Sequence, residues 1–192
     1  MIPEHNQSGV LPPFLPGSTP ASPGSMAPYR VSLLHVAQRF GINEVRIRIL
    51  NGLVAYRSQL RKEGISAGFQ WVDGSFVEHS ERVLGRPPGD VDIITFAQRP
   101  KQYRDPAIWR VFVHSRPDLF DPTQTKKQSL CDAYFVDLST DPLFLVNQTR
   151  YWFGLFSHQR ETFLWKGMLE VPIGADDADV CAFLDGGGEY GS

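Results

Sequence analysis

The sequence predicts a single α/β (α+β) domain in which helices pack on a small mixed β-sheet. Segments with a helical spacing of apolar residues alternate along the chain with short β-prone runs. The 192 residues, of which 42% are apolar and 21% charged, are enough to build one ordinary core. Composition also changes at both ends of the chain, so we expect the folded domain to span residues 29–172.

Two helices are predicted at the start of this domain. Apolar residues recur at helical spacing over 31–40, and Gly41 follows where a helix commonly ends. The second helix is predicted over about 43–63. Asn43 is a good N-cap for this helix, and one of its faces stays apolar to its end.

The rest of the domain alternates strands and helices. Between the second and third β-prone runs, Asp105 and Pro106 are typical of an N-cap followed by the first residue of a helix. A later helix is predicted over 143–156. The predicted strands cover residues 69–72, 91–96, 131–138 and 162–171.

The two ends of the chain have unusual compositions. Residues 1–28 hold seven of the fifteen prolines and are predicted to form an extended arm, with Val10 and Leu11 among its apolar anchors to the domain. Residues 173–192 are rich in acids and glycine and contain no lysine or arginine, so a flexible acidic tail is predicted there. Without its acidic C-terminal part, the chain has a net charge of about +4.

Charge and composition exclude several classes of protein. A net charge of −2 gives no broad basic surface for duplex DNA, and no apolar stretch approaches the length of a membrane span. We therefore expect no membrane partner and no secretion. Cys131 and Cys181 are too few for a disulfide framework, which favours a cytoplasmic location. The five histidines lack the spacing of metal ligands, and no glycine-rich dinucleotide or Walker motif is present.

Polar residues cluster on three successive predicted strands. Gly74 and Ser75 follow the first strand, Asp90 and Asp92 open the second, and Asp132 lies early in the third. Residues i and i+2 of a strand share a face, so Asp90 and Asp92 form a carboxylate pair. Such a pair suits Mg²⁺ or Mn²⁺, and a third carboxylate would allow a second ion, as in phosphoryl and nucleotidyl transfer.

These motifs, within residues 68–78, 87–96 and 131–138, resemble the nucleotidyltransferases of the DNA polymerase β superfamily. The likeness spans about residues 40–172. It is greatest to small bacterial stand-alone members, some of which are found near toxin–antitoxin or phage-defence genes. The resemblance implies that Gly74 and Ser75 bind nucleotide phosphates and that the metals are held by Asp90, Asp92 and Asp132.

Several assignments remain open at this level. Asp137 is an alternative third carboxylate, but it would face the opposite side of the strand from Asp132. Lys126 and Lys166 are candidate phosphate contacts. Residues 79–86 are predicted to form an inserted loop at the mouth of the site. The aromatic residues of the last third form either core or a base-stacking platform: Tyr151, Trp152, Phe153, Phe156, Phe163 and Trp165.

The resemblance implies transfer of a nucleoside monophosphate from a nucleoside triphosphate to an RNA, protein or small-molecule acceptor. The alternative is an inactive nucleotidyltransferase fold that serves as a binding or regulatory module, such as an antitoxin or a nucleotide sensor.

Overall fold

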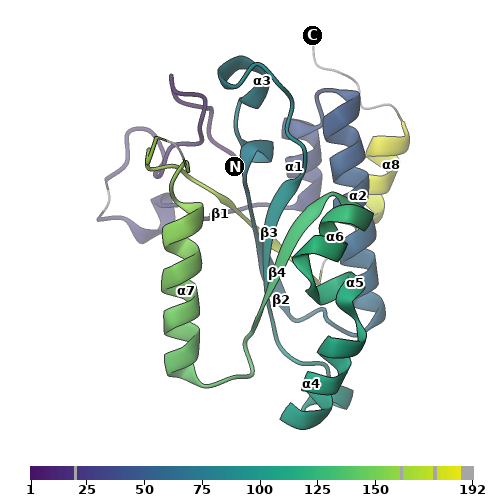
Figure 1. The fold of residues 1–192 in the computed structure, drawn as a ribbon. Helices are drawn as coiled ribbons and strands as arrows, with labels where there is room; N and C mark the ends of the chain where they lie inside the picture. The colour runs from purple at the N-terminus through teal and green to yellow at the C-terminus, as the bar shows by residue number, and fades with distance from the viewer. Residues whose placement is uncertain (20, 161, 175–176, 187–192) are drawn as a thin grey trace.

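The computed structural model describes residues 1–19, 21–160, 162–174 and 177–186, and these residues build a mixed five-stranded sheet (Figure 1). The strand order is β1-β5-β2-β3-β4, and β3 is antiparallel to β2 but parallel to β4. The predicted α/β class with a mixed sheet is therefore confirmed. The strands are β1 (Tyr29–Arg30), β2 (Gly68–Asp73), β3 (Val91–Ala97), β4 (Cys131–Asp137) and β5 (Leu169–Pro172).

Helices cover both faces of the sheet (Figure 1). α7 (Pro142–Phe156) lies on one face, while most of the other helices lie on the opposite face. No helix among the described residues is long and apolar enough to cross a membrane. The remaining helices are α1 (Leu33–Phe40), α2 (Glu44–Lys62), α3 (Ser80–Val83), α4 (Pro106–Ser115), α5 (Pro117–Phe120), α6 (Pro122–Ser129) and α8 (Ala178–Asp185).

The predicted helix starts are confirmed. The Asn43 side chain accepts a hydrogen bond from the Arg46 amide at 3.0 Å and caps α2. Asp105 accepts from the Ala107 amide at 2.7 Å, so it caps α4 directly before the proline that opens the helix. These side chains satisfy amide groups that have no partner within the helix.

The two faces of the sheet carry cores of different size. The larger core packs α1, α2, α4 and α5 against residues such as Val91 and Ile93 of β3. The smaller core lies under α7 and contains Trp152 and Phe156, packed against Ile94. Alternation along β3 divides its side chains between the two cores.

The predicted strand over 162–171 is wrong over residues 162–168. Only Leu169–Pro172 is a strand, and the preceding residues are irregular, with Phe163 at a φ of 55°. Their backbone groups pair elsewhere: the Lys166 amide donates to the Ser157 carbonyl, and the Gly167 amide donates to the Leu11 carbonyl at 2.7 Å. The N-terminal segment thus provides the hydrogen-bond partner at the point where the predicted strand would continue before β5.

The N-terminal segment packs more deeply than the predicted arm. Val10 and Leu11 are fully buried, and the Tyr29 hydroxyl donates to the Pro12 carbonyl at 2.7 Å. A side chain at Gly167 would come within 2.4 Å of the same carbonyl oxygen. The segment therefore belongs to the packed body of the protein.

The predicted flexible acidic tail is wrong for the part that the structure describes. Residues 178–185 form α8, whose Val180 and Leu184 are buried one helical turn apart. The Asp177 carboxylate is buried and receives hydrogen bonds from Arg57 and Arg61 of α2. An acid count could not predict this pairing, because the partners lie more than a hundred residues away. Residues 175–176 and 187–192 of the predicted tail lie outside the described residues.

Replacing Asp177 by alanine is expected to lower the free energy of unfolding by about 3 to 5 kcal/mol. The change leaves the guanidinium of Arg57, which is 0% exposed, without its charged partner. Urea denaturation measures the effect, and Asp179→Ala is the matched control. Asp179 is exposed on the first turn of α8, so its loss should cost less than about 1 kcal/mol. Equal losses would contradict the assigned role of Asp177.

Candidate active site

The register of the sheet places three carboxylates side by side. Asp92 of β3 pairs with Asp132 of β4 on one side and with Asp73 of β2 on the other. Directly opposed residues of neighbouring strands project from the same face. The three acids therefore form a row across the sheet, on the face that α7 covers further along the strands.

A lysine from α6 joins two of the predicted acidic residues. The Lys126 ammonium forms an ion pair with the Asp90 carboxylate and lies 3.9 Å from an oxygen of Asp132. Asp90 also raises the pKa of Lys126 through a hydrogen bond. Two predicted metal ligands thus converge on one ammonium group, and the Lys126 side chain that carries it is 54% exposed.

Asp92 lies between the charges of the other two predicted ligands and is itself largely buried. Its burial, together with the negative charges of Asp90 and Asp132, raises the pKa of Asp92 to about 6. An ionised Asp92 therefore lowers the stability of the protein unless a cation lies close to it.

The turn after β2 brings the backbone next to this acid. Gly74 has a φ of 82°, in the region that favours glycine, and a side chain at this position would lie 2.2 Å from the Asp92 Oδ2 atom. Ser75 follows at once and opens the 3-10 turn η2 (Ser75–Val77). The structure thus brings the predicted Gly-Ser pair and the Asp-x-Asp motif together.

Lys166 does not reach the surface of the site. It is 3% exposed, and its ammonium lies 2.7 Å from Glu78 Oε1 and 3.1 Å from Asp73 Oδ1. Burial alone would lower the pKa of Lys166, but the two carboxylates hold it above its ordinary value. This enclosure is inconsistent with the predicted phosphate contact, and Lys166 instead links the segment before Gly167 to both ends of the Gly74–Ser75 turn.

One lysine cannot fully neutralise two buried acids. Glu78 lies closer to the ammonium and also accepts from the Gln159 side-chain amide at 2.9 Å. Burial raises the pKa of Asp73 to about 7, against the lowering effect of Lys166. Asp73 therefore carries a proton over much of the acidic range.

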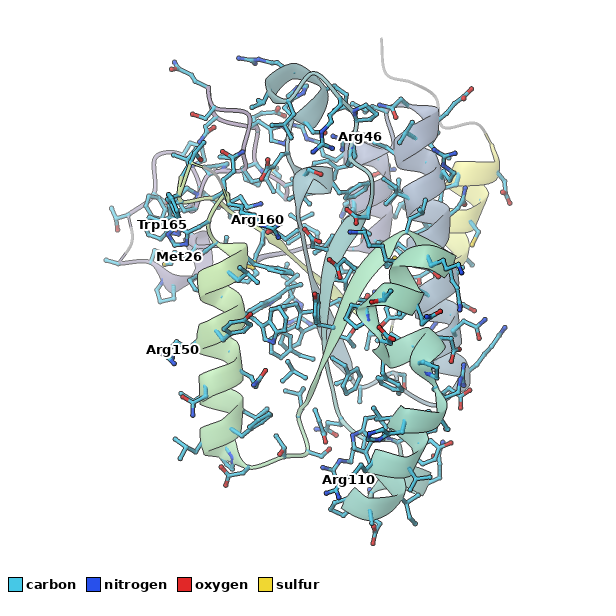
Figure 2. The ribbon with its side chains drawn as sticks, viewed as in Figure 1. Met26, Arg46, Arg110, Arg150, Arg160 and Trp165 are labelled. Carbon is cyan, nitrogen blue, oxygen red and sulfur yellow. The ribbon has the colours of Figure 1, made fainter. Side chains whose placement is uncertain are left out.

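A buried arginine of α2 holds the loop that follows the turn. Arg46, near the end of the sheet that carries the site (Figure 2), is 1% exposed and donates to the carbonyls of Phe76 and Glu78. It also pairs with Glu81 in the predicted inserted loop, which forms the short helix α3. This contact fixes the backbone on the far side of Ser75.

The remaining predicted residues lie away from this row. Asp137 is paired with Ala97 at the opposite end of β4, and its carboxylate binds Arg99 at 2.6 Å. The aromatic set is only partly core, and a base-stacking role for its exposed members stays a prediction. Trp152 and Phe156 belong to the smaller core, whereas Phe163 is 80% exposed.

The carboxylates of the site are the available donors for a divalent cation. No group of three His, Cys, Asp or Glu side chains among the described residues is arranged to hold a metal ion. Asp90 and Asp132 nevertheless direct oxygens at one ammonium, which marks a position for a positive charge between them. Mg²⁺ needs only one or two protein carboxylates when water and phosphate supply its other ligands. The donor set therefore fits an ion bound together with a phosphate.

Sequence reasoning missed three residues that build the site: Asp73, Glu78 and Arg46. Asp73 directly precedes Gly74 and is an even number of residues from Trp71, so strand alternation places it on the face of the site. Arg46 lies four residues before Leu50 on the buried face of α2, and a charged residue there signals a buried partner. Glu78 carries no comparable signal.

Replacing Asp92 by asparagine is expected to stabilise the metal-free protein at neutral pH. The folded state binds the Asp92 proton more tightly than the unfolded state, so its contribution to stability is lost as pH rises from about 4 to about 6. Asparagine avoids this loss. The stability gained by the Asp92→Asn substitution should be near zero below pH 4 and reach about 3 kcal/mol above pH 7.

Urea denaturation at several pH values, with a chelator present, measures this difference. Asp137→Asn is the matched control, because it deprives Arg99 of its partner and should lower stability instead. A difference between Asp92→Asn and wild type that does not vary with pH would contradict the assigned burial and repulsion.

Comparisons with known proteins give a family but no function. A search of curated proteins found no match, and a search of solved structures found none. Residues 3–172 match the model of a family described as "Family of unknown function (DUF6932)". The matched residues include the N-terminal segment and all the acids of the row. The chain therefore belongs to the DUF6932 family.

Proposed function

We propose that the protein is a metal-dependent nucleotidyltransferase. The observation that carries the proposal is the juxtaposition of Asp92 and Asp132 on paired strands, with Gly74 held against Asp92 by a conformation that only glycine adopts easily. Clustered acids beside a close-approaching backbone turn suit a cation and a polyphosphate.

The proposed roles follow from position. Asp90 and Asp92, with Asp132, would hold Mg²⁺ or Mn²⁺, which supplies neutralisation of phosphate charge in the transition state. Gly74 and Ser75 would position the triphosphate. An acceptor hydroxyl then forms a bond to the α-phosphorus of the nucleotide as the bond to pyrophosphate breaks, and Asp132 accepts the hydroxyl proton.

Lys126 occupies the position that the proposed cation would take. Its exposed ammonium could move towards phosphate oxygens once a divalent ion neutralises Asp90 and Asp132. The predicted phosphate contact of Lys126 would then form only in the complex. RNA, protein and small molecules all stay candidate acceptors.

The alternative proposal is a binding or regulatory module without catalysis, such as a nucleotide sensor or an antitoxin. The pairing of the acids with lysines favours this candidate. Lys126 and Lys166 offset part of their charge, so the cluster does not require a metal for stability. A transfer assay separates the two proposals.

Incubation with radiolabelled nucleoside triphosphates and cell extract is expected to transfer label in the presence of Mg²⁺ and not with a chelator. Asp92→Asn should reduce transfer at least about 100-fold, because several kcal/mol of charge stabilisation depend on the metal ligands. Asp179→Asn, on exposed α8, should transfer label as the wild type does.

Calorimetric titration with the four nucleoside triphosphates completes the test. Binding to the wild type without label transfer would favour the non-enzymatic module. Neither binding nor transfer would refute the proposed function and leave the fold unaffected.

A further inference from the structure

A polar cavity lies beside the candidate active site. It has a volume of about 320 Å³, at the lower end of the range of about 300–1,000 Å³ for small-molecule sites. Its wall combines the N-terminal segment with the end of α1 and the loop after η2. Glu78 and His79 of that loop follow the Gly74–Ser75 turn by only a few residues.

Basic groups dominate this cavity. Arg39, Arg46 and Arg82 line it together with His5 and His79. The donors of Arg46 are already bound to carbonyls, Ser80 and Glu81, so Arg46 contributes charge alone. Arg39 and Arg82 are the guanidinium groups that remain able to bind a ligand.

Arg39, which lines the cavity, has one unpaired donor. Its Nε atom is buried and has no hydrogen-bond partner among the described residues. A buried donor without a partner is unfavourable, and an anionic oxygen is its strongest acceptor. Arg82 is exposed, and within the described part of the chain its side chain makes only a long contact of 3.5 Å with the Gln7 carbonyl.

An acid of the N-terminal segment already binds one of these two arginines. The Glu4 carboxylate lies 2.5 Å from Arg39 Nη2, yet the Glu4 side chain is 83% exposed. An exposed pair of this kind is worth little, so a ligand with more charge can displace the carboxylate. The other acid of the wall, Glu78, is turned to Lys166 and Gln159.

We propose that this cavity is a second binding site, which takes the phosphate group of a small ligand between Arg39 and Arg82. Two guanidinium groups match the oxygens of a phosphate through paired, charge-assisted hydrogen bonds. Glu4 acts as an internal competitor for the same position. The site goes beyond the proposed function and does not depend on it.

Calorimetric titration of the full chain with inorganic phosphate, in metal-free buffer, tests the proposal. The wild type should bind saturably. Arg82→Gln and Arg39→Gln should each weaken binding about tenfold, the effect of one charge-assisted hydrogen bond. Glu4→Gln should tighten binding by removing the competitor. Ribose 5-phosphate, titrated in parallel, distinguishes a site for a phosphate monoester from one for the free anion, and saturable binding of either supports the proposal.

Two controls make the result specific. Arg86→Gln removes an exposed arginine on the same loop that does not line the cavity, and it should bind phosphate as the wild type does. Asp179→Asn, on exposed α8, should also leave phosphate binding unchanged. No saturable binding to the wild type, or equal binding in Arg82→Gln and Arg86→Gln, would overturn the proposal. Arg82 lies on the surface, so its replacement does not depend on how well the core tolerates change.

Discussion

Repulsion between carboxylates at one end of the sheet is the constraint on which the rest of the site depends. Pairing of Asp92 with both Asp73 and Asp132 follows from the strand register, so the acids cannot separate without breaking the sheet. The structure offsets the repulsion with Lys166 on the buried side and Lys126 on the open side. The buried Lys166 thus stabilises the fold, whereas the exposed Lys126 could be displaced from the acids by a ligand.

The buried side also explains how the turn is held. Lys166 joins Asp73, before the turn, to Glu78, after it, while Arg46 binds the carbonyls beyond Ser75. Two cations from distant parts of the chain therefore fix this short backbone segment. Preorganisation of this kind would favour the proposed binding of phosphate, because the turn then need not be ordered when the ligand binds.

Local patterns were enough to predict most elements but not the long-range pairs. Helix caps such as Asn43 and strand alternation through Asp90 and Asp92 are encoded within a few residues, so they could be predicted. The helix α8 was missed because Val180 and Leu184 pack into the larger core and the preceding Asp177 pairs with Arg57, contacts that no window of sequence contains. The burial of Lys166 was missed for the same reason, since both of its partners lie about ninety residues earlier.

Metal and nucleotide binding at the row of acids can be seen in a crystal structure with Mn²⁺ and a non-hydrolysable nucleoside triphosphate, because anomalous scattering locates the metal without assumptions about its ligands. We expect a Mn²⁺ peak between Asp90, Asp92 and Asp132, the triphosphate against Gly74 and Ser75, and the Lys126 ammonium displaced from Asp90. A nucleotide bound elsewhere, or Lys126 still paired with Asp90 and no metal at the acids, would contradict this expectation.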